Sequence, residues 1–200
     1  DMHDIKYDKY MSIYNDTNNT YELIDYDSKI DIKIRKSLKD KIYIYDGSLN
    51  NIGEDDTALS KSWYTKKNYL HKKLKNNLLN YFQNIMKSKS DDNLWTTFKD
   101  YQHKLKGKGY TKGFISSTLR ATNEYKHKTV LAYTINKYLQ PVIKDYFRSH
   151  NIGVNEDLYA ISELIQWIWR SAIREGNEIH IYLPSRRMRE LLELWLDGKL

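Results

Sequence analysis

The sequence contains no cysteine, and this absence excludes disulfide bonds, thiolate metal sites and a cysteine nucleophile. It also lacks a run of eighteen apolar residues, and no charged and then apolar leader opens it. We therefore expect an intracellular, cytoplasmic protein with no membrane partner. The six histidines are scattered, without a His-x-x-x-His pair or a carboxylate cluster, so the sequence predicts no metal site.

Aromatic and basic residues are plentiful. An apolar share of 40%, with five tryptophans and eighteen tyrosines, is enough to build the core of one medium-sized domain. The net charge of +7 is uneven, because residues 59–112 hold 13 Lys and Arg against 3 Asp and Glu, or +10. A concentrated basic segment is typical of proteins that bind a nucleic-acid backbone. A compositional bias towards lysine on a solvated helix stays open as the alternative.

Short apolar runs alternate with longer amphipathic ones, and this pattern favours an α/β fold. Residues 1–38 are acidic and weakly patterned, so we expect them to form a small accessory element or the tail of a preceding domain. Residues 39–200 are expected to form the main lobe. Strands are predicted at 42–45, 94–98, 114–118, 129–133 and 179–183. Helices are predicted at 60–88, 99–105, 135–149, 156–174 and 184–198, with a flexible basic loop at 107–113.

The most distinctive motif lies in the predicted helix 156–174. Gln166, Arg170 and Arg174 follow one another at four-residue intervals among apolar residues. Side chains four residues apart share a helix face, so the three are expected to form one polar stripe. The planar, permanently charged fork of arginine suits phosphate or carboxylate. The stripe therefore indicates an anionic partner, and pairing of both arginines with surface acids is the alternative.

The order of the predicted elements, with an arginine-bearing helix before the last strand, resembles the second RecA-like lobe of superfamily 2 helicases. More closely, it is similar to the C-terminal part of DEAD/DEAH-type helicase-like proteins of bacterial phages and mobile elements. In that family a Gln is followed four residues later by an Arg and then by a second Arg. Gln166 and Arg170 have this spacing, and Arg174 comes one residue later than the usual second Arg. Weaker matches lie at residues 45–48, 95–98 and 118–125, so the resemblance covers residues 40–198.

This resemblance implies a three-layer RecA-like lobe with a mostly parallel sheet. The lobe would supply Arg170, Arg174 and Gln166 to ATP and Mg²⁺ that are held mainly by a first lobe of the same polypeptide. It also implies a nucleic-acid partner, DNA rather than RNA, whose backbone would meet short polar and basic side chains near strand ends. These side chains are Thr96, Thr97, Lys99, Arg120, Thr122 and Asn123.

The sequence contains no Gly-x-x-x-x-Gly-Lys-Ser/Thr phosphate-binding loop and no acidic Mg²⁺ motif after a strand. We therefore expect it to be one lobe of a longer polypeptide that does not hydrolyse ATP by itself. A non-catalytic nucleic-acid-binding module of a phage or mobile-element protein and a protein-interaction domain are the alternative functions. Ordinary strand propensity would also explain Thr96 and Thr97. Core packing, rather than base stacking, would explain Trp63, Trp167 and Trp169.

Overall fold

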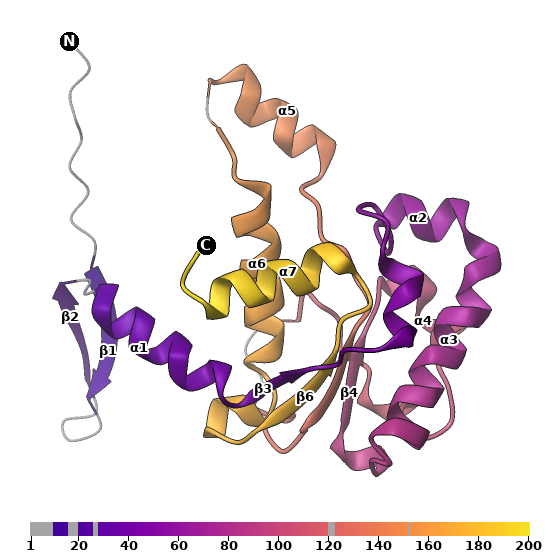
Figure 1. Ribbon diagram of the computed structural model, residues 1–200. Coiled ribbons are helices and arrows are strands. Elements are labelled where there is room, and N and C mark those ends of the chain that lie inside the picture. Colours follow the sequence, from indigo (N-terminus) through magenta and orange to yellow (C-terminus); the bar gives the residue numbers. More distant parts are fainter. Residues whose placement is uncertain (1–9, 16–19, 26–27, 120–122, 152) are drawn as a thin grey trace.

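Four parallel strands form the centre of the computed structural model, which describes residues 10–15, 20–25, 28–119, 123–151 and 153–200. Their order across the sheet is β3-β6-β5-β4, so the first two of them along the chain form its edges. Helices cover both faces of the sheet (Figure 1), which confirms the predicted three-layer α/β fold. The strands are β3 (Ile42–Ile44), β4 (Asn93–Thr96), β5 (Val130–Tyr133) and β6 (Ile179–Tyr182), close to four of the five predicted strands.

Strand β5 shows why short apolar runs form this sheet. Its side chains Leu131 and Tyr133 enter one hydrophobic core, and Val130 and Ala132 enter a second core on the opposite face. Leu131 lies opposite Ile181 in the parallel register with β6. Because successive side chains point to opposite faces, a strand covered by helices on both sides is apolar throughout.

The first core lies between the sheet and the helices α1 (Ser28–Lys39), α6 (Glu156–Ile168) and α7 (Arg186–Leu196) (Figure 1). Asn155 caps α6 as predicted, because its side chain accepts hydrogen bonds from two first-turn N–H groups at 3.0 Å. Ser185 caps α7 in the same way by accepting from the N–H of Met188 at 3.4 Å. These two caps fix where both helices begin at the same edge of the sheet.

The second core lies under α2 (Lys61–Lys66), α3 (His71–Asn80) and α4 (Gln102–Leu105) on the other face. The prediction of one helix over 60–88 is wrong, because the chain turns at Lys67. There the imidazole of His71 binds the carbonyl oxygen of Tyr64 at 2.9 Å. This carbonyl is therefore not available in the usual way to the N–H group four residues later. A π-helix (Tyr81–Ile85) continues α3, and 3-10 helices lie at Ser48–Gly53, Asn68–Leu70, Ser90–Asp92, Lys99–Tyr101, Thr111–Gly113 and Ala172–Glu175.

Two more predicted helices are shorter than expected. The segment predicted as helix 135–149 begins as α5 (Pro141–Ser149), since proline at the first helical position disfavours a helical residue before it. Gln140 is accordingly extended, with ψ 135°. Helix α6 ends at Ile168 instead of 174, and the N–H of Ala172 bonds to the carbonyl of Lys128 at 2.9 Å. The chain after α6 is thus held by a neighbouring loop and not by helical hydrogen bonds.

The predicted strand 114–118 is also wrong. Phe114 forms one isolated parallel bridge with Trp95, at the outer side of β4. Beyond it, the hydroxyl of Ser116 binds the hydroxyl of Thr118 at 2.9 Å and accepts from the N–H of Thr118 at 3.3 Å. Such local side-chain-to-backbone bonds compete with the ladder of a strand.

An antiparallel hairpin of β1 (Tyr10–Asn15) and β2 (Thr20–Asp25) precedes α1. The second half of α1 contacts α7, because the Arg35 guanidinium lies 5.0 Å from the Trp195 ring centroid and Lys39 pairs with Asp197 at 2.5 Å. The division at residue 38 between an N-terminal element and the main lobe stays a prediction. Within the described ranges, no helix has both the length and the apolar character needed to cross a lipid bilayer.

Candidate functional site

The chain leaves the neighbouring strands β4 and β5 in opposite directions. After β4 it enters α4, whose Leu105 belongs to the second core, and after β5 it runs through α5 to α6 on the first core. In open α/β sheets, ligands bind outside the carboxyl ends of strands at such a switch point. The crevice between the carboxyl ends of β4 and β5 is therefore where the fold favours a binding site.

A cavity of ≈ 620 Å³ occupies this crevice, and we name it the switch-point cavity. Its size lies within the usual range for small-molecule sites. Three lysines, many hydroxyl groups and several aromatic or apolar side chains line it, and the described residues contribute no carboxylate to it. Its lining is Thr57, Ser60, Lys61, Ser62, Thr97, Phe98, Lys99, Ser116, Ser117, Thr118, Asn136, Lys137, Tyr138, Leu139, Gln140, Pro141 and Tyr159.

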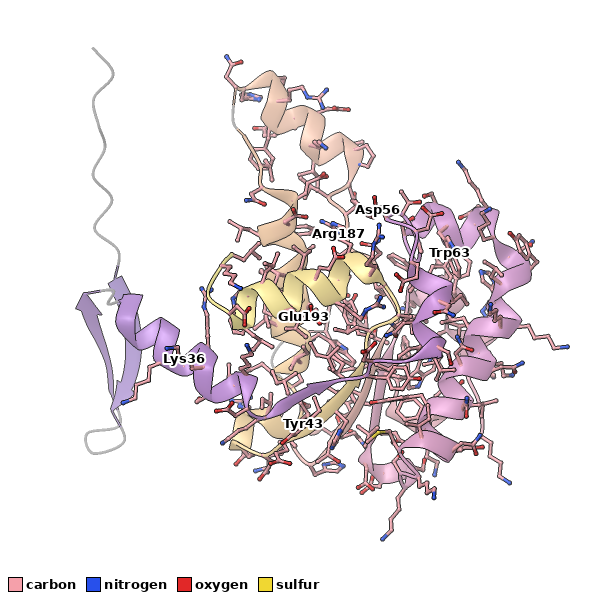
Figure 2. The ribbon with its side chains drawn as sticks, viewed as in Figure 1. Lys36, Tyr43, Asp56, Trp63, Arg187 and Glu193 are labelled. Atoms are coloured by element: carbon pink, nitrogen blue, oxygen red, sulfur yellow. The ribbon has the colours of Figure 1, made fainter. Side chains whose placement is uncertain are left out.

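Asn136 and Arg187 hold the walls of the switch-point cavity together. The Asn136 amide donates to the carbonyl oxygens of Asp56 at 2.7 Å and Ala58 at 3.0 Å. Arg187 donates to the amide oxygen of Asn136 at 3.0 Å and pairs with Asp157 at 2.7 Å. Figure 2 shows Arg187 on α7 and Asp56 on the loop before α2 at the same edge of the sheet. The cavity wall is thus assembled from segments that are far apart in the sequence.

Tyr64 joins the segments that follow β4 and β5, behind the residues that line the cavity. Its hydroxyl donates to the carbonyl of Thr134 at 2.7 Å and accepts from the hydroxyl of Thr97 at 3.1 Å. Burial raises the pKa of Tyr64 well above its usual value, so the phenol stays protonated. Thr96 is fully buried and Thr97 is 1% exposed, so neither hydroxyl lies on the outer surface. Of these two predicted phosphate-contacting residues, Thr97 alone lines the cavity.

A second cavity of ≈ 850 Å³ lies along α6, and we name it the arginine cavity. It brings together Gln166, Arg170 and Arg174, the three residues predicted to serve catalysis, and adds the half-exposed Trp169. Ser117, Thr118, Lys137, Gln140 and Tyr159 line both cavities, so the two adjoin across a shared wall, and we name the pair the cleft.

Arg170 is the most unusual group in this cleft. Its side chain carries a charge although the residue is only 8% exposed. One terminal nitrogen, Nη2, donates to the carbonyl of Leu119, whereas Nη1 has no hydrogen-bond partner among the described residues. Burial lowers the pKa of Arg170, and the nearby carboxylate of Glu163 partly opposes this. A buried cation with an open donor is suited to an anionic ligand.

The polar stripe expected along one helix is wrong, because α6 ends before Arg170 and Arg174. Arg174 is exposed and donates to the side-chain oxygen of Asn123. Neither arginine pairs with a carboxylate in the part of the chain that the structure describes, which counts against the alternative of surface ion pairs. The cavity, and not a helix face, is what brings these residues together.

The chain matches the family model described as the YonV C-terminal Rossmann-like domain over residues 36–196. The chain belongs to this family. It is also 54% identical over 199 residues to the SPbeta prophage-derived uncharacterized protein YonV of Bacillus subtilis (strain 168). That alignment covers 100% of this chain and 48% of the relative, so the chain spans about half the length of the curated relative it matches. No solved structure matches the chain.

The other residues predicted to contact nucleic acid are not gathered at one place in this Rossmann-like domain. Lys99 is exposed and lines the switch-point cavity, whereas Asn123 is engaged with Arg174. Arg120 and Thr122 lie outside the described residues. Core packing is confirmed for Trp63 and Trp167, which are buried in the second and first cores respectively.

Sequence reasoning missed most of the cleft walls. Lys137, Gln140 and Tyr159 line both cavities but belong to no recognisable motif. One signal was available for the first of these, since Lys137 follows the strand β5 by four residues, and ligand-binding residues of α/β folds gather after strand ends.

Proposed function

We propose that this domain is a nucleic-acid-binding module of a prophage-type protein and that it holds the phosphate backbone on a surface of exposed lysines. This lysine surface consists of six residues from the α2–α4 layer. They are Lys66, Lys67, Lys72, Lys73, Lys104 and Lys106, and all are exposed. DNA is the expected partner, bound without sequence preference, because lysine binds phosphate as a point charge and does not read base edges.

The observation that carries this proposal is the lack of charge compensation on the lysine surface. Elsewhere, basic side chains pair with carboxylates, as in Arg189 with Glu54 at 2.6 Å and Lys137 with Glu163 at 2.8 Å. Among the described residues, by contrast, the six lysines have no carboxylate within ion-pair distance. Figure 2 shows long, nitrogen-tipped side chains that extend outward from this layer. Uncompensated positive charge attracts a polyanion and releases its counterions.

A triple variant tests the proposal. Lys66→Gln, Lys72→Gln and Lys73→Gln together remove three charges from the lysine surface. We expect weaker binding to labelled duplex DNA in fluorescence anisotropy. The slope of the logarithm of the binding constant against the logarithm of the salt concentration should become shallower by roughly 0.9 for each phosphate group that the variant no longer neutralises. The same titrations with single-stranded DNA and with RNA identify the preferred nucleic acid.

The matched control removes the same net charge elsewhere, through Lys36→Gln, Lys144→Gln and Lys199→Gln, all at exposed positions. This control is expected to retain the affinity of the wild type within about twofold, since surface charges farther than about 8–10 Å from the polyanion are largely screened at physiological salt. Equal decreases in affinity in both triple variants would mean that net charge, and not the lysine surface, governs binding.

A second candidate function is the C-terminal lobe of an ATP-dependent helicase or translocase, as the family resemblance implies. It is favoured by the grouping of Gln166, Arg170 and Arg174 around one cavity, with Nη1 of Arg170 open. ATP would supply the phosphoryl group and Mg²⁺ would neutralise its charge, and a first lobe would hold most of both. The arginines of this domain would stabilise charge on the phosphate oxygens, and Gln166 would orient a water molecule.

Nucleotide turnover by the full-length polypeptide tests this second candidate, with and without DNA. We expect DNA-stimulated turnover that falls at least about a hundredfold in Arg174→Ala, in line with the removal of a charge-stabilising arginine. Arg174 is preferred to Arg170 for this test because it is exposed, so that its removal spares the fold. If the wild type binds DNA but shows no nucleotide turnover, the helicase candidate fails and the nucleic-acid-binding module remains.

A further inference from the structure

Basic side chains line both ends of the cleft, but only the switch-point end adds several aromatic and apolar side chains. In the switch-point cavity, Phe98, Tyr138, Leu139 and Pro141 offer flat or apolar surfaces. The arginine cavity instead presents guanidinium groups. We infer that this cleft binds a free nucleoside di- or triphosphate within the domain itself, with the base and sugar in the switch-point cavity and the phosphates towards Arg170. This site is separate from the lysine surface and needs no second lobe.

The charge of the cleft fits a ligand with several negative charges. Five basic side chains line it, and Glu163 is the one carboxylate that the described residues contribute. Glu163 is already paired with Lys137 at 2.8 Å, at the junction of the two cavities. Lys61 pairs with Asp100, outside the cleft lining, at 3.7 Å. Three basic side chains are therefore left without a carboxylate partner among the described residues, namely Lys99, Arg170 and Arg174. A bare monoanion would leave most of this charge unmatched.

The unpartnered nitrogen Nη1 of Arg170 indicates where the phosphates of the ligand would lie. Buried donors in folded proteins nearly always have an acceptor, and leaving a charged donor without one is strongly destabilising. Because Nη2 is held by the carbonyl of Leu119, the guanidinium is oriented before a ligand arrives. A phosphate oxygen at the open Nη1 would accept the missing bond, and the exposed Arg174 lies in the same cavity.

The apolar end is equally well ordered. Tyr138 donates its hydroxyl to the carbonyl of Asp56 at 2.9 Å, and the Arg187 guanidinium lies 4.4 Å from its ring centroid. Lys137 lies 5.8 Å from the ring centroid of Tyr159. These interactions fix the aromatic walls, so a planar base would meet a preformed surface.

The test uses this domain and the fluorescence of Trp169, which lines the arginine cavity at 41% exposure, together with calorimetry. The probes are ATP, ADP, adenosine and inorganic phosphate, followed by the other nucleoside triphosphates. We expect ATP and ADP to bind at least about tenfold more tightly than either adenosine or phosphate, because each fragment can occupy only one end of the cleft. Equal binding of phosphate and ATP, or no binding of ATP at about 1 mM, would overturn the inference.

Two variants locate the ligand. Arg170→Gln and the exposed Arg174→Gln are each expected to weaken ATP binding about tenfold or more, as the removal of a charge-assisted hydrogen bond predicts. Arg174→Gln keeps the test valid if Arg170→Gln fails to fold. If Arg174→Gln binds ATP as the wild type does, the phosphates do not lie in the arginine cavity and the inference fails.

The lysine-surface variant separates this inference from the proposed nucleic-acid function. Lys66→Gln, Lys72→Gln and Lys73→Gln together are expected to leave ATP affinity unchanged within about twofold, because these positions lie outside the cleft lining. A loss of ATP binding in this triple variant would place the nucleotide on the lysine surface and overturn the inference. Failure of DNA binding alone would count only against the nucleic-acid module.

Discussion

At the scale of single residues, Arg170 is held by the backbone and not by a carboxylate. A carbonyl such as that of Leu119 orients a guanidinium without neutralising it, so the positive charge remains available in the cleft. Glu163 lies near enough to oppose the effect of burial on the pKa of Arg170, but its own ion pair is with Lys137. The site thus keeps a pre-oriented cation, at a cost in desolvation that a bound anion would offset.

His71 is the residue from which we expect a pH dependence of stability. It is buried, its imidazole binds the carbonyl of Tyr64, and burial lowers its pKa below 6.5, an effect that Lys104 reinforces. Below pH 6.5 the unfolded chain therefore takes up a proton that the native state resists. The free energy of unfolding should fall as the pH drops through 6.5, by at most about 1.4 kcal/mol per pH unit, until the lower native pKa is passed.

Urea denaturation between about pH 7.5 and 5.5 measures this effect. His71→Gln keeps a donor for the carbonyl but cannot titrate, so its stability should depend less on pH than that of the wild type. His150→Gln, at an exposed position at the end of α5, serves as the control and should behave as the wild type does. An unchanged pH dependence in His71→Gln would mean that other groups account for it.

At the scale of elements, strands were easier to predict than helix ends. The strand β5 is a short apolar run, and β3 and β6 alternate around buried isoleucines, so both patterns are visible locally. The breaks in the long helices depend instead on partners elsewhere, such as the imidazole of His71 for α2 and the carbonyl of Lys128 after α6. Pro141 is the exception, because its missing N–H group is a local signal for the start of α5 that the predicted helix 135–149 did not use.

The candidate site was predictable only in part for the same reason. Gln166, Arg170 and Arg174 were found from their spacing along the chain, although α6 ends before both arginines. The cleft walls at Tyr138 and Tyr159 come from separate segments that only the folded topology brings together. Spacing rules find residues on one element, whereas a site between elements depends on the strand order.

At the scale of the whole molecule, the two cores share one sheet and should unfold together. Each of β5 and β6 sends alternate side chains into both cores, so neither helical layer can be lost without exposing apolar residues of the strands. Leu74 of α3 and Leu164 of α6 are fully buried in the second and the first core respectively. Leu74→Ala and Leu164→Ala are each expected to lower the free energy of unfolding by about 2–5 kcal/mol.

We expect both variants to keep a single unfolding transition, with the same dependence on denaturant as the wild type. Hydrogen exchange measured by mass spectrometry should then show α3 and α6 losing protection at the same free energy in each variant. If Leu74→Ala opened the α2–α4 layer alone while α6 stayed protected, the layers would be separate folding units. If unfolding is cooperative, the lysine surface and the cleft depend on the same fold. The reason is that β4 and β5, whose carboxyl ends frame the cleft, also pack against the layer that carries the lysines.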